Sequence, residues 1–466
     1  MTTATALATP PGEALRAAVA RRSPRVVEAL DPGHALARAR AWAARSVPDA
    51  TVEAVRVRSV RYHPDGGCTL RYLVQLSSAG PERLLLVRVP ASGTGIAVRP
   101  FPADPDLPTL RHALDPLLMR EVLGRVVPGT GGARAIGRCE VDVVRYPREE
   151  RCVLRYRLSP GAGGAGELHH PVVFGKVYGD SSAATTAAGL RVLRAGLRVL
   201  PGPLRVVVPQ PLAVVPSLRL GLTEAIPGRP VLPDLLRRAC EAGPGADRRL
   251  QEAVAAAARA AAAVHACDSW GTRLPVRDLA VERALAERDL TALDPVWPGV
   301  AAYLRRRVVG ALEAVAGNGS ATGWPVVPVL AHGDLTPGQV LLDDSGRAGI
   351  VDVDTLCVAE PALDLGRFLA YLHVAGIRRS PAAWPLLADL TGIFLTTYLD
   401  VQAPSAGAGN VAVDARRLLL ARTAAYRVLA LARLGASACR QLKDDRLGAA
   451  TDVLDAGNDW MRSVAV

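Results

Sequence analysis

Lysine is almost absent from this sequence. Of 56 basic residues only Lys176 and Lys443 are lysines, and all the others are arginines. The arginines are spread along the chain instead of forming a block. The formal net charge of +12 therefore favours a solvated basic surface over a nucleic-acid-binding patch. Four phenylalanines and three methionines against 50% hydrophobic residues indicate a folded core built from small aliphatic side chains.

Cysteine pairs, metal clusters and long apolar runs are also missing. The seven cysteines form no C-x-x-C pair and no cluster with histidine, which argues against a zinc site and a disulfide framework and favours reduced thiols in a cytoplasmic protein. No stretch approaches the roughly 18 uninterrupted apolar residues of a transmembrane helix, and the first residues lack the apolar core of a signal peptide. We expect no membrane association. At 466 residues, two or three domains are expected.

The stretch 329–371 organises the chain, because it alternates short apolar runs with loops that carry acids. One run ends in the loop His332-Gly333-Asp334, a second begins after Gln339, and a third ends at Asp352. A turn signal, DDSG, separates the last two runs and predicts a hairpin, which would place the acids at one end of it. Phosphoryl transfer needs a carboxylate that deprotonates a hydroxyl and oxygen ligands for magnesium. We interpret Asp334 as the base and Gln339 and Asp352 as magnesium ligands. The alternative is an ordinary hairpin with solvated acids.

The segments HGDLTPGQVLL, IVDVD and EPALDLGRFL resemble, in this order, the motifs of the aminoglycoside phosphotransferase and choline kinase superfamily. Three ordered motifs are a specific signal, whereas one alone would be weak. The resemblance implies that Asp334 is the catalytic aspartate, that Asp352 binds magnesium and that Asp364 supports the catalytic loop. The family usually carries Asn where this chain has Gln339, and maltose-kinase-like relatives carry Gln there. Asp354 is a further candidate for contact with metal or acceptor, or a solvated acid.

A three-stranded pattern occurs twice. SVRYHPDGGCTLRYLVQL from Ser59 is echoed by VVRYPREERCVLRYRLS from Val143, and each continues into an apolar strand with a central cation, Arg88 or Lys176. This predicts an internal duplication, with two similar hairpins by chance as the alternative. A lysine in a chain that otherwise uses arginine suggests a compact ammonium that reaches nucleotide phosphates. The resemblance implies the same role for Lys176, and Arg88 would be its non-catalytic counterpart.

Three further features of the sequence concern where a nucleotide would bind: a hinge-like segment, the turn before Lys176 and the helix after it. The segment LGLTEAIPGRP resembles the hinge between kinase lobes, where backbone groups of Glu224, Ala225 and Ile226 would meet adenine. No glycine-rich loop precedes Lys176. Arg148 or Arg151 in the corresponding turn could help to bind phosphate, and the helix that follows has no acid to pair with the lysine.

These patterns predict an α+β, protein-kinase-like two-lobed fold with an extra N-terminal cap. We assign residues 1–135 to a cap with helices and a β unit, 136–227 to the kinase-like N-terminal lobe, and 228–466 to a helical C-terminal lobe with the catalytic loop. The predicted function is ATP- and Mg²⁺-dependent phosphoryl transfer to a hydroxyl of a small molecule such as an aminoglycoside, sugar or amino alcohol. The alternative is a nucleotide-binding pseudokinase that acts as a scaffold or sensor. A nucleic-acid partner is not expected, because the chain shows no aromatic platform or nucleic-acid-binding motif.

Overall fold

The computed structural model describes residues 11–47, 49–77, 81–92, 95–128, 136–148, 150–161, 168–201, 205–242, 247–268, 273–319, 327–402 and 410–457. They divide into two compact units. Unit 1 comprises Met1–Pro102, Ala280–Gly317 and Val428–Gly457, and unit 2 comprises Ala103–Leu279, Asn318–Arg427 and Asn458–Val466. Each unit combines segments from distant parts of the chain, and the assignment of residues 1–135, 136–227 and 228–466 to a cap and two lobes stays a prediction.

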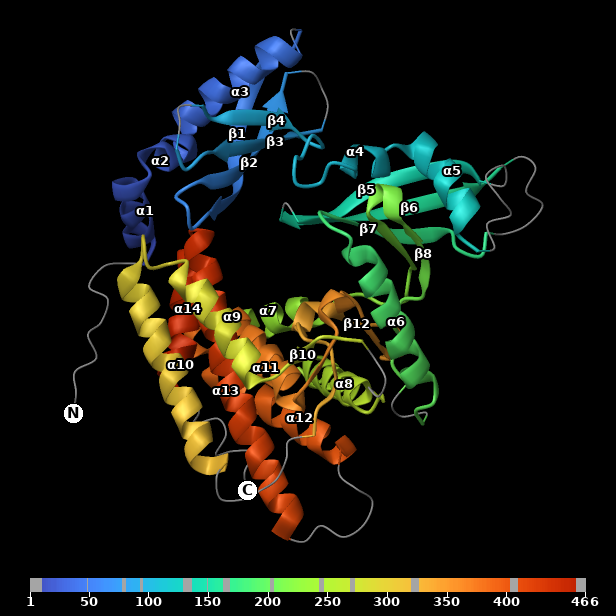
Figure 1. Ribbon diagram of the computed structural model, residues 1–466, viewed down its shortest axis with the longest axis vertical. Helices are drawn as coiled ribbons and strands as arrows, with labels where there is room; N and C mark the ends of the chain where they lie inside the picture. The colour runs from blue at the N-terminus through green and yellow to red at the C-terminus, as the bar shows by residue number, and fades with distance from the viewer. Residues whose placement is uncertain are drawn as a thin grey trace. The chain divides into compact units, whose positions relative to one another are not determined.

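Unit 1 begins with three helices that lead into a four-stranded antiparallel sheet (Figure 1). The helices are α1 (Pro11–Arg22), α2 (Pro24–Leu30) and α3 (Pro32–Ser46). The strands, in sheet order, are β1 (Val52–Tyr62), β2 (Cys68–Leu76), β3 (Arg83–Val89) and β4 (Ala97–Pro100). The remaining elements come from later in the chain: most of α9 (Leu279–Thr291) and α10 (Pro298–Gly319), the end of α13 (Asn410–Arg440), and α14 (Asp444–Asp455).

Unit 2 opens with a β-rich part. Helices α4 (Leu110–Ala113) and α5 (Pro116–Val126) precede a five-stranded antiparallel sheet with the order β5-β6-β7-β9-β8. Its strands are β5 (Ile136–Arg148), β6 (Arg151–Pro160), β7 (Val172–Tyr178), β8 (Pro211–Val215) and β9 (Leu220–Glu224), and α6 (Ser182–Arg198) lies between β7 and β8 in the chain.

The rest of unit 2 is mainly helical and confirms the predicted α+β class. Its helices are α7 (Leu232–Ala242), α8 (Arg248–His265), α11 (Pro361–Ile377), α12 (Trp384–Gln402) and the first part of α13. Five short strands lie among them: β10 (Val276–Arg277), β11 (Val329–Ala331), β12 (Val340–Leu342), β13 (Ala348–Ile350) and β14 (Cys357–Ala359). The predicted hairpin is present, since β12 and β13 pair antiparallel with Val340 opposite Ile350.

Small side chains form the core of the helical part, as the composition predicts. Helix α8 begins at its N-cap Asp247 and buries alanines on most of its circumference, so α12 packs closely against it. The segment Pro381–Gln402 is long and apolar enough to cross a membrane by length and composition. Its buried face, which includes Leu390, Phe394 and Leu395, belongs to the core, and core helices commonly pass the same test. All seven cysteines are free thiols.

The repeated unit is present in the structure and is larger than the sequence comparison suggests. In each copy an aspartate caps a helix whose first residue is proline: Asp31 caps α3, and Asp115 caps α5. Each copy also has a fully buried tyrosine on its second strand. The Tyr72 hydroxyl donates to the carbonyl of Ala29, and the Tyr156 hydroxyl donates to that of Ala113; both bonds span 43 residues.

The strand register agrees with this correspondence. Arg88 on β3 lies opposite Thr69, and Lys176 on β7 lies opposite Val153. Thr69 and Val153 each follow the cysteine of the motif C-x-L-R-Y, which occurs in both copies. We name residues 24–89 the first copy and residues 108–178 the second copy. The two cations that the sequence paired therefore occupy equivalent positions on equivalent strands.

Candidate active site

The predicted catalytic loop follows β11 and is held by the carboxylate of Asp364. Asp364 lies in the first turn of α11 and is fully buried. Its Oδ2 accepts from the backbone N–H of His332 at 2.7 Å, and its Oδ1 accepts from that of Gly333 at 2.8 Å. Burial raises the pKa of Asp364, but the hydrogen bonds from the His265 ring and from the backbone N–H of His332 outweigh it and leave the pKa below its usual value. Asp364 therefore braces the loop as an anion.

Histidines complete the support beneath the loop. His265, at the end of α8, lies 3.1 Å from Asp364 Oδ2 and 2.9 Å from the Tyr398 hydroxyl. His332 Nε2 lies 3.1 Å from the carbonyl oxygen of Val351, and its Nδ1 accepts from the backbone N–H of Asp334 at 3.3 Å. This pattern requires the neutral tautomer with the proton on Nε2. His332 thus joins the loop to the strand that precedes Asp352.

Gly333 is required by the shape of this loop. Its φ is +76°, and an added Cβ would lie 2.2 Å from the carbonyl oxygen of Thr355. Only glycine accepts that backbone and that approach without strain. The next side chain, Asp334, consequently leaves the loop in a fixed direction.

Asp334 meets a cation that the sequence analysis missed. Arg367 Nε lies 2.7 Å from Asp334 Oδ1, and the arginine side chain is only 13% exposed. Arg367 follows Asp364 by three residues on α11, so both side chains project from one face of that helix. The helix therefore contacts the catalytic loop twice, once at its backbone and once at its carboxylate. The spacing D-x-x-R in EPALDLGR was the available signal.

Lys176 meets the acids at the end of the hairpin. Lys176 Nζ lies 2.6 Å from Asp352 Oδ1 and also pairs with Asp354. Lys176 and Asp352 are 176 positions apart in the sequence. Asp352 has a left-handed backbone with φ of 66° and ψ of 45°, a conformation that is costly for a residue other than glycine. The structure thus brings together the lysine of the second copy and the acids of the hairpin.

Two further side chains of the second copy join this cluster. Arg151 Nη1 lies 2.8 Å from Asp354 Oδ2, and the Tyr178 hydroxyl donates to Asp354 Oδ1 at 3.1 Å. Tyr178 follows Lys176 by two residues, so strand alternation puts it on the same face. The side chain of Arg148, the other cation that the sequence suggested, lies outside the described residues.

The cluster is strongly cationic around Asp352. Burial raises the pKa of this carboxyl, but the charges of Lys176, Arg151 and Arg145 lower it by more, and the net pKa lies well below its usual value. Arg145 Nη1 is 3.8 Å from Asp352 Oδ2 and mostly exposed. Asp352 is therefore an anion at any physiological pH, as a magnesium ligand must be.

Gln339 is placed near the hairpin but its carbonyl oxygen is already engaged. That oxygen accepts from the Thr336 N–H at 2.8 Å and from the Thr336 hydroxyl at 3.1 Å. Thr336 and Gln339 form a capping box around a short 3₁₀ turn. Gln339 has to give up one of these bonds before it can bind a cation, and its metal-ligand role stays a prediction.

The predicted hinge follows β9. Glu224 is the last residue of β9, and its side chain accepts from the Gln210 N–H at 2.9 Å and from Arg194 at 3.0 Å. Ala225 is exposed and Ile226 is half-buried. The Ile226 δ-methyl lies so close to Gly349 of β13 that a Cβ there would be 2.8 Å from it. The hinge thus packs against the strand that leads to Asp352, while adenine binding stays a prediction.

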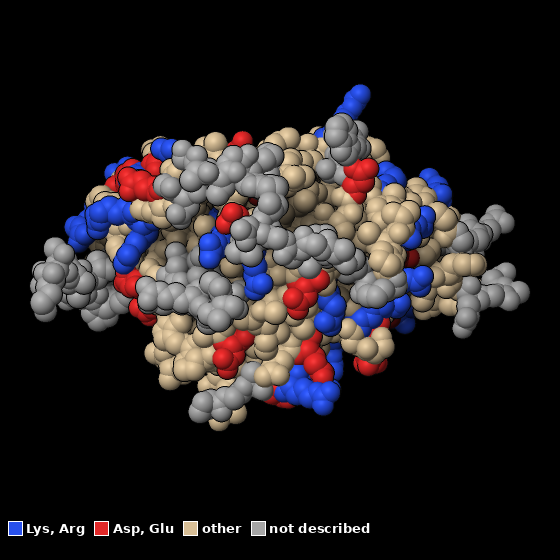
Figure 2. All heavy atoms as spheres, turned by 90° about the horizontal axis from the view of Figure 1, so that it is seen from below, with Lys and Arg blue, Asp and Glu red and all other residues tan. Residues whose placement is uncertain are grey.

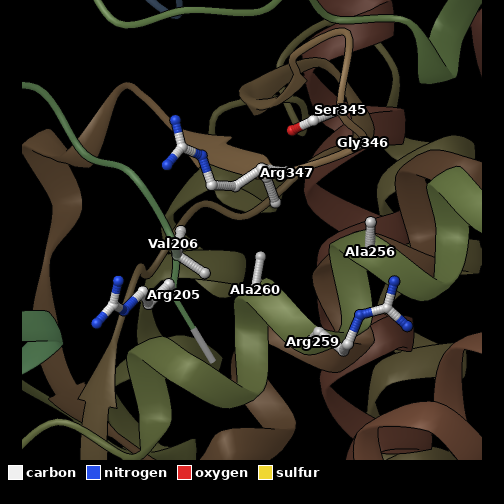
Figure 3. A pocket seen from close by; sticks show the side chains of 9 residues that line it. Arg205, Val206, Ala256, Arg259, Ala260, Ser345, Gly346 and Arg347 are labelled. Carbon is white, nitrogen blue, oxygen red and sulfur yellow. The ribbon is translucent and has the colours of Figure 1, made fainter. Parts of the chain in front are cut away.

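A separate cavity of about 290 Å³ lies behind the hairpin turn. Figure 3 shows the side chains of Arg205, Arg259 and Arg347 around a floor that includes Val206 and Ala260. None of the predicted site residues lines this cavity. Over the face drawn in Figure 2, basic and acidic side chains are interspersed instead of forming one basic patch, which does not favour nucleic-acid binding there.

Comparison with known families supports the motif assignment. The model of the phosphotransferase enzyme family matches residues 180–383. This range contains Asp334, Gln339, Asp352 and Asp364 and begins just after Lys176. The resemblance to the aminoglycoside phosphotransferase superfamily is confirmed over these residues, which match the family model. No curated protein sequence matches the chain.

Three of the solved structures that match the chain are a choline kinase, an ethanolamine kinase and an aminoglycoside phosphotransferase. Choline kinase from Cryptosporidium parvum is 13% identical, and the match covers 74% of this chain and 95% of that chain with a TM-score of 0.47. Ethanolamine kinase from Plasmodium vivax is 11% identical over 75% and 90% of the two chains, with a TM-score of 0.45. An aminoglycoside phosphotransferase from Streptomyces rimosus, in complex with ADP and streptomycin, is 18% identical over 59% and 90%, with a TM-score of 0.35.

Proposed function

We propose that this chain is an ATP- and Mg²⁺-dependent phosphotransferase that moves the γ-phosphoryl group of ATP to a hydroxyl of a small molecule. One observation carries the proposal. Lys176 on β7 lies 2.6 Å from Asp352 at the end of the hairpin, in the same unit as the Asp334 loop that Asp364 braces. A phosphate-binding cation, a metal-binding acid and a base on a rigid loop are the parts that phosphoryl transfer uses.

The proposed reaction assigns one task to each side chain. Asp334 accepts the proton of the acceptor hydroxyl as the new O–P bond forms and the bond between the γ-phosphorus and the β–γ bridging oxygen breaks, leaving ADP. Lys176 leaves its ion pair with Asp352 and binds phosphate oxygens. Arg151 compensates part of the phosphate charge. Asp364 fixes the loop, so Asp334 keeps its orientation during the reaction.

The donor set fits magnesium. Asp352 supplies a carboxylate that is kept ionised, and Gln339 supplies an amide oxygen once it is released from Thr336. Two protein oxygens are enough, because Mg²⁺ usually completes its shell with phosphate oxygens and water. When bound, Mg²⁺ neutralises charge on the phosphates. Among the described residues no group of three or more His, Cys, Asp or Glu side chains could hold a metal ion, and the proposal assigns the metal to Asp352 and Gln339.

A second candidate function is a nucleotide-binding pseudokinase. The observation in its favour is the capping box that holds the Gln339 oxygen. If that oxygen stays with Thr336, the chain has one metal ligand and could bind nucleotide without transferring phosphate.

The test is ADP release from Mg·ATP with a panel of sugars, aminoglycosides and amino alcohols. The wild-type protein should release ADP in an acceptor-dependent way, and Asp334→Asn should abolish that release while ATP binding measured by calorimetry stays unchanged. Undiminished turnover in Asp334→Asn would refute the assignment of the base. Binding of Mg·ATP without release, with any acceptor, would favour the pseudokinase.

A further inference from the structure

The charges around the catalytic loop do not resemble a site for a cationic acceptor. Arg367 occupies the Oδ1 side of Asp334 at 2.7 Å and is mostly buried. Arg277, on β10, donates from Nη1 to the carbonyl oxygen of Gly333 at 2.9 Å. Two guanidinium groups therefore contact consecutive residues of the loop that would receive the acceptor hydroxyl. A carboxylate has two oxygens, so Asp334 Oδ2 remains to accept the hydroxyl proton beside this fixed cation.

The acids of the site are already matched by cations. Asp352 and Asp354 pair with Lys176, and Arg151 pairs with Asp354. Asp364 is committed to His265 and the loop backbone. Glu360, the N-cap of α11, pairs with Arg422. In the part of the chain that the structure describes, each of these carboxylates has a cationic partner or a backbone donor.

The net charge of the side chains around the site indicates how it would interact with Mg·ATP and with a charged acceptor. Five cationic side chains lie around the three carboxylates of Asp334, Asp352 and Asp354. Four of them pair with these carboxylates, namely Lys176, Arg145, Arg151 and Arg367, and the fifth, Arg277, contacts the neighbouring carbonyl of Gly333. The excess of two positive charges matches Mg·ATP, which carries about two negative charges when its phosphates are ionised. Once the nucleotide is bound, the described residues leave no surplus negative charge at this site to recognise an ammonium group on the acceptor.

We infer that Arg367 determines the charge class of the acceptor: the site takes neutral or anionic hydroxyl compounds and rejects polycations. This rests on the proposed function and narrows it. Arg367 acts by its charge beside Asp334, since an acceptor ammonium that approaches the base also approaches the guanidinium. The inference sets this chain apart from an enzyme that selects choline or an aminoglycoside through acids in its site.

The experiment compares acceptors of related structure that carry different charges. One set is glucose, glucosamine and glucuronate, and a second is glycerol, ethanolamine and glycerate. The wild-type protein should use the neutral or acidic member of the productive set with a kcat/KM about tenfold or more above that of the amine. Arg367→Gln should bring the ratio close to one, and Arg367→Lys, the matched control that keeps the charge, should preserve it.

Several outcomes would overturn the inference while leaving the proposed function intact. One is ADP release that is equal or faster with the amine. Another is an unchanged ratio in Arg367→Gln. If Arg367→Gln turns over too slowly, binding of the same compounds to the Mg·ADP-loaded variant and wild type by calorimetry supplies the ratio.

A further assay needs no known acceptor, because water takes the place of the acceptor and ATP is hydrolysed to ADP and phosphate. Kanamycin should leave this hydrolysis unchanged in the wild type and slow it in Arg367→Gln, and slowing of the wild-type reaction would contradict the inference. No ADP release with any compound, and none in water, would instead remove the proposed function itself.

Discussion

The two copies of the repeated unit share a scaffold but differ in chemistry. Tyr72 and Tyr156 are equally buried and make the same hydrogen bond to a carbonyl 43 residues earlier. Asp31 and Asp115 cap equivalent helices. On the third strand, however, the first copy carries Arg88, which is exposed, and the second carries Lys176, which is largely buried against Asp352. The comparison teaches that the framework is separable from the proposed phosphate binding, which depends on one strand position and the acids that it contacts.

The largest effect is expected when the equivalent cations of the two copies, Lys176 and Arg88, are replaced in turn. Lys176→Met should reduce turnover about 10²- to 10³-fold, because it removes a charge aimed at the transferring phosphate. Arg88→Met, the equivalent change in the first copy, should leave turnover within about twofold of the wild type. The measurement is kcat for Mg·ATP-dependent ADP release with the best acceptor. A similar loss in both variants would show that the first copy takes part in the reaction.

The second prediction tests the symmetry of the tyrosines at high pH. Burial raises the pKa of Tyr72 to about 12, and it raises the pKa of Tyr156 as well. A phenol whose pKa is raised on folding holds its proton more tightly in the folded state. The stability it contributes is therefore complete below about pH 10 and is lost as the pH rises towards 12, by about 1.4 kcal/mol per pH unit. Each tyrosine should thus cost about 2 to 3 kcal/mol of unfolding free energy by pH 12.

The measurement is urea unfolding at a series of pH values, with phenolate absorbance as a second signal. Tyr72→Phe and Tyr156→Phe should each flatten the alkaline fall in stability by a similar amount, and each should lose about 1 kcal/mol at neutral pH because a buried carbonyl loses its donor. A flattening confined to one variant would mean that the two frameworks are not equivalent.

The smallest expected effect concerns the helix caps. Asp115 accepts from the backbone N–H groups of Leu117 and Leu118, whereas Asp31 accepts from the backbone N–H of His34 and lies 3.0 Å from the Nδ1 of the same residue. Asp115→Ala should lower the free energy of unfolding by about 1 kcal/mol, and Asp31→Ala by somewhat less. Chemical unfolding followed by circular dichroism measures both. Asn at either position is the matched control, since it keeps the capping oxygen and should retain most of the stability.

The sequence predicted those parts of the site that lie in local motifs. Asp334, Asp352 and Asp364 belong to one short stretch, and the hairpin between β12 and β13 was legible from its turn. Lys176 was recognisable because lysine is so rare here. The α+β class followed from the same patterns and is confirmed.

Other features depended on contacts that no local pattern reveals. Arg367 and Tyr178 lie on the right faces of α11 and β7, but only the fold shows which partner each face meets. The helical half of the repeat was missed because its shared letters, ALDP, are too short a match to indicate a repeat on their own. The Thr336–Gln339 capping box has the local signature T-x-x-Q, but Gln339 was interpreted as a metal ligand because of its position in the family motif. The two units combine distant segments, which spacing along the chain cannot show.

At Asp352, which has a left-handed backbone, the residue that would favour stability differs from the residue that the proposed catalysis needs. Glycine would adopt that φ without strain, so selection for heat resistance alone would favour replacing the residue that the chemistry requires. Attempts to harden this protein by consensus or random mutagenesis should therefore be screened for turnover as well as for survival at high temperature. A lineage released from the need to phosphorylate would be expected to lose this aspartate early.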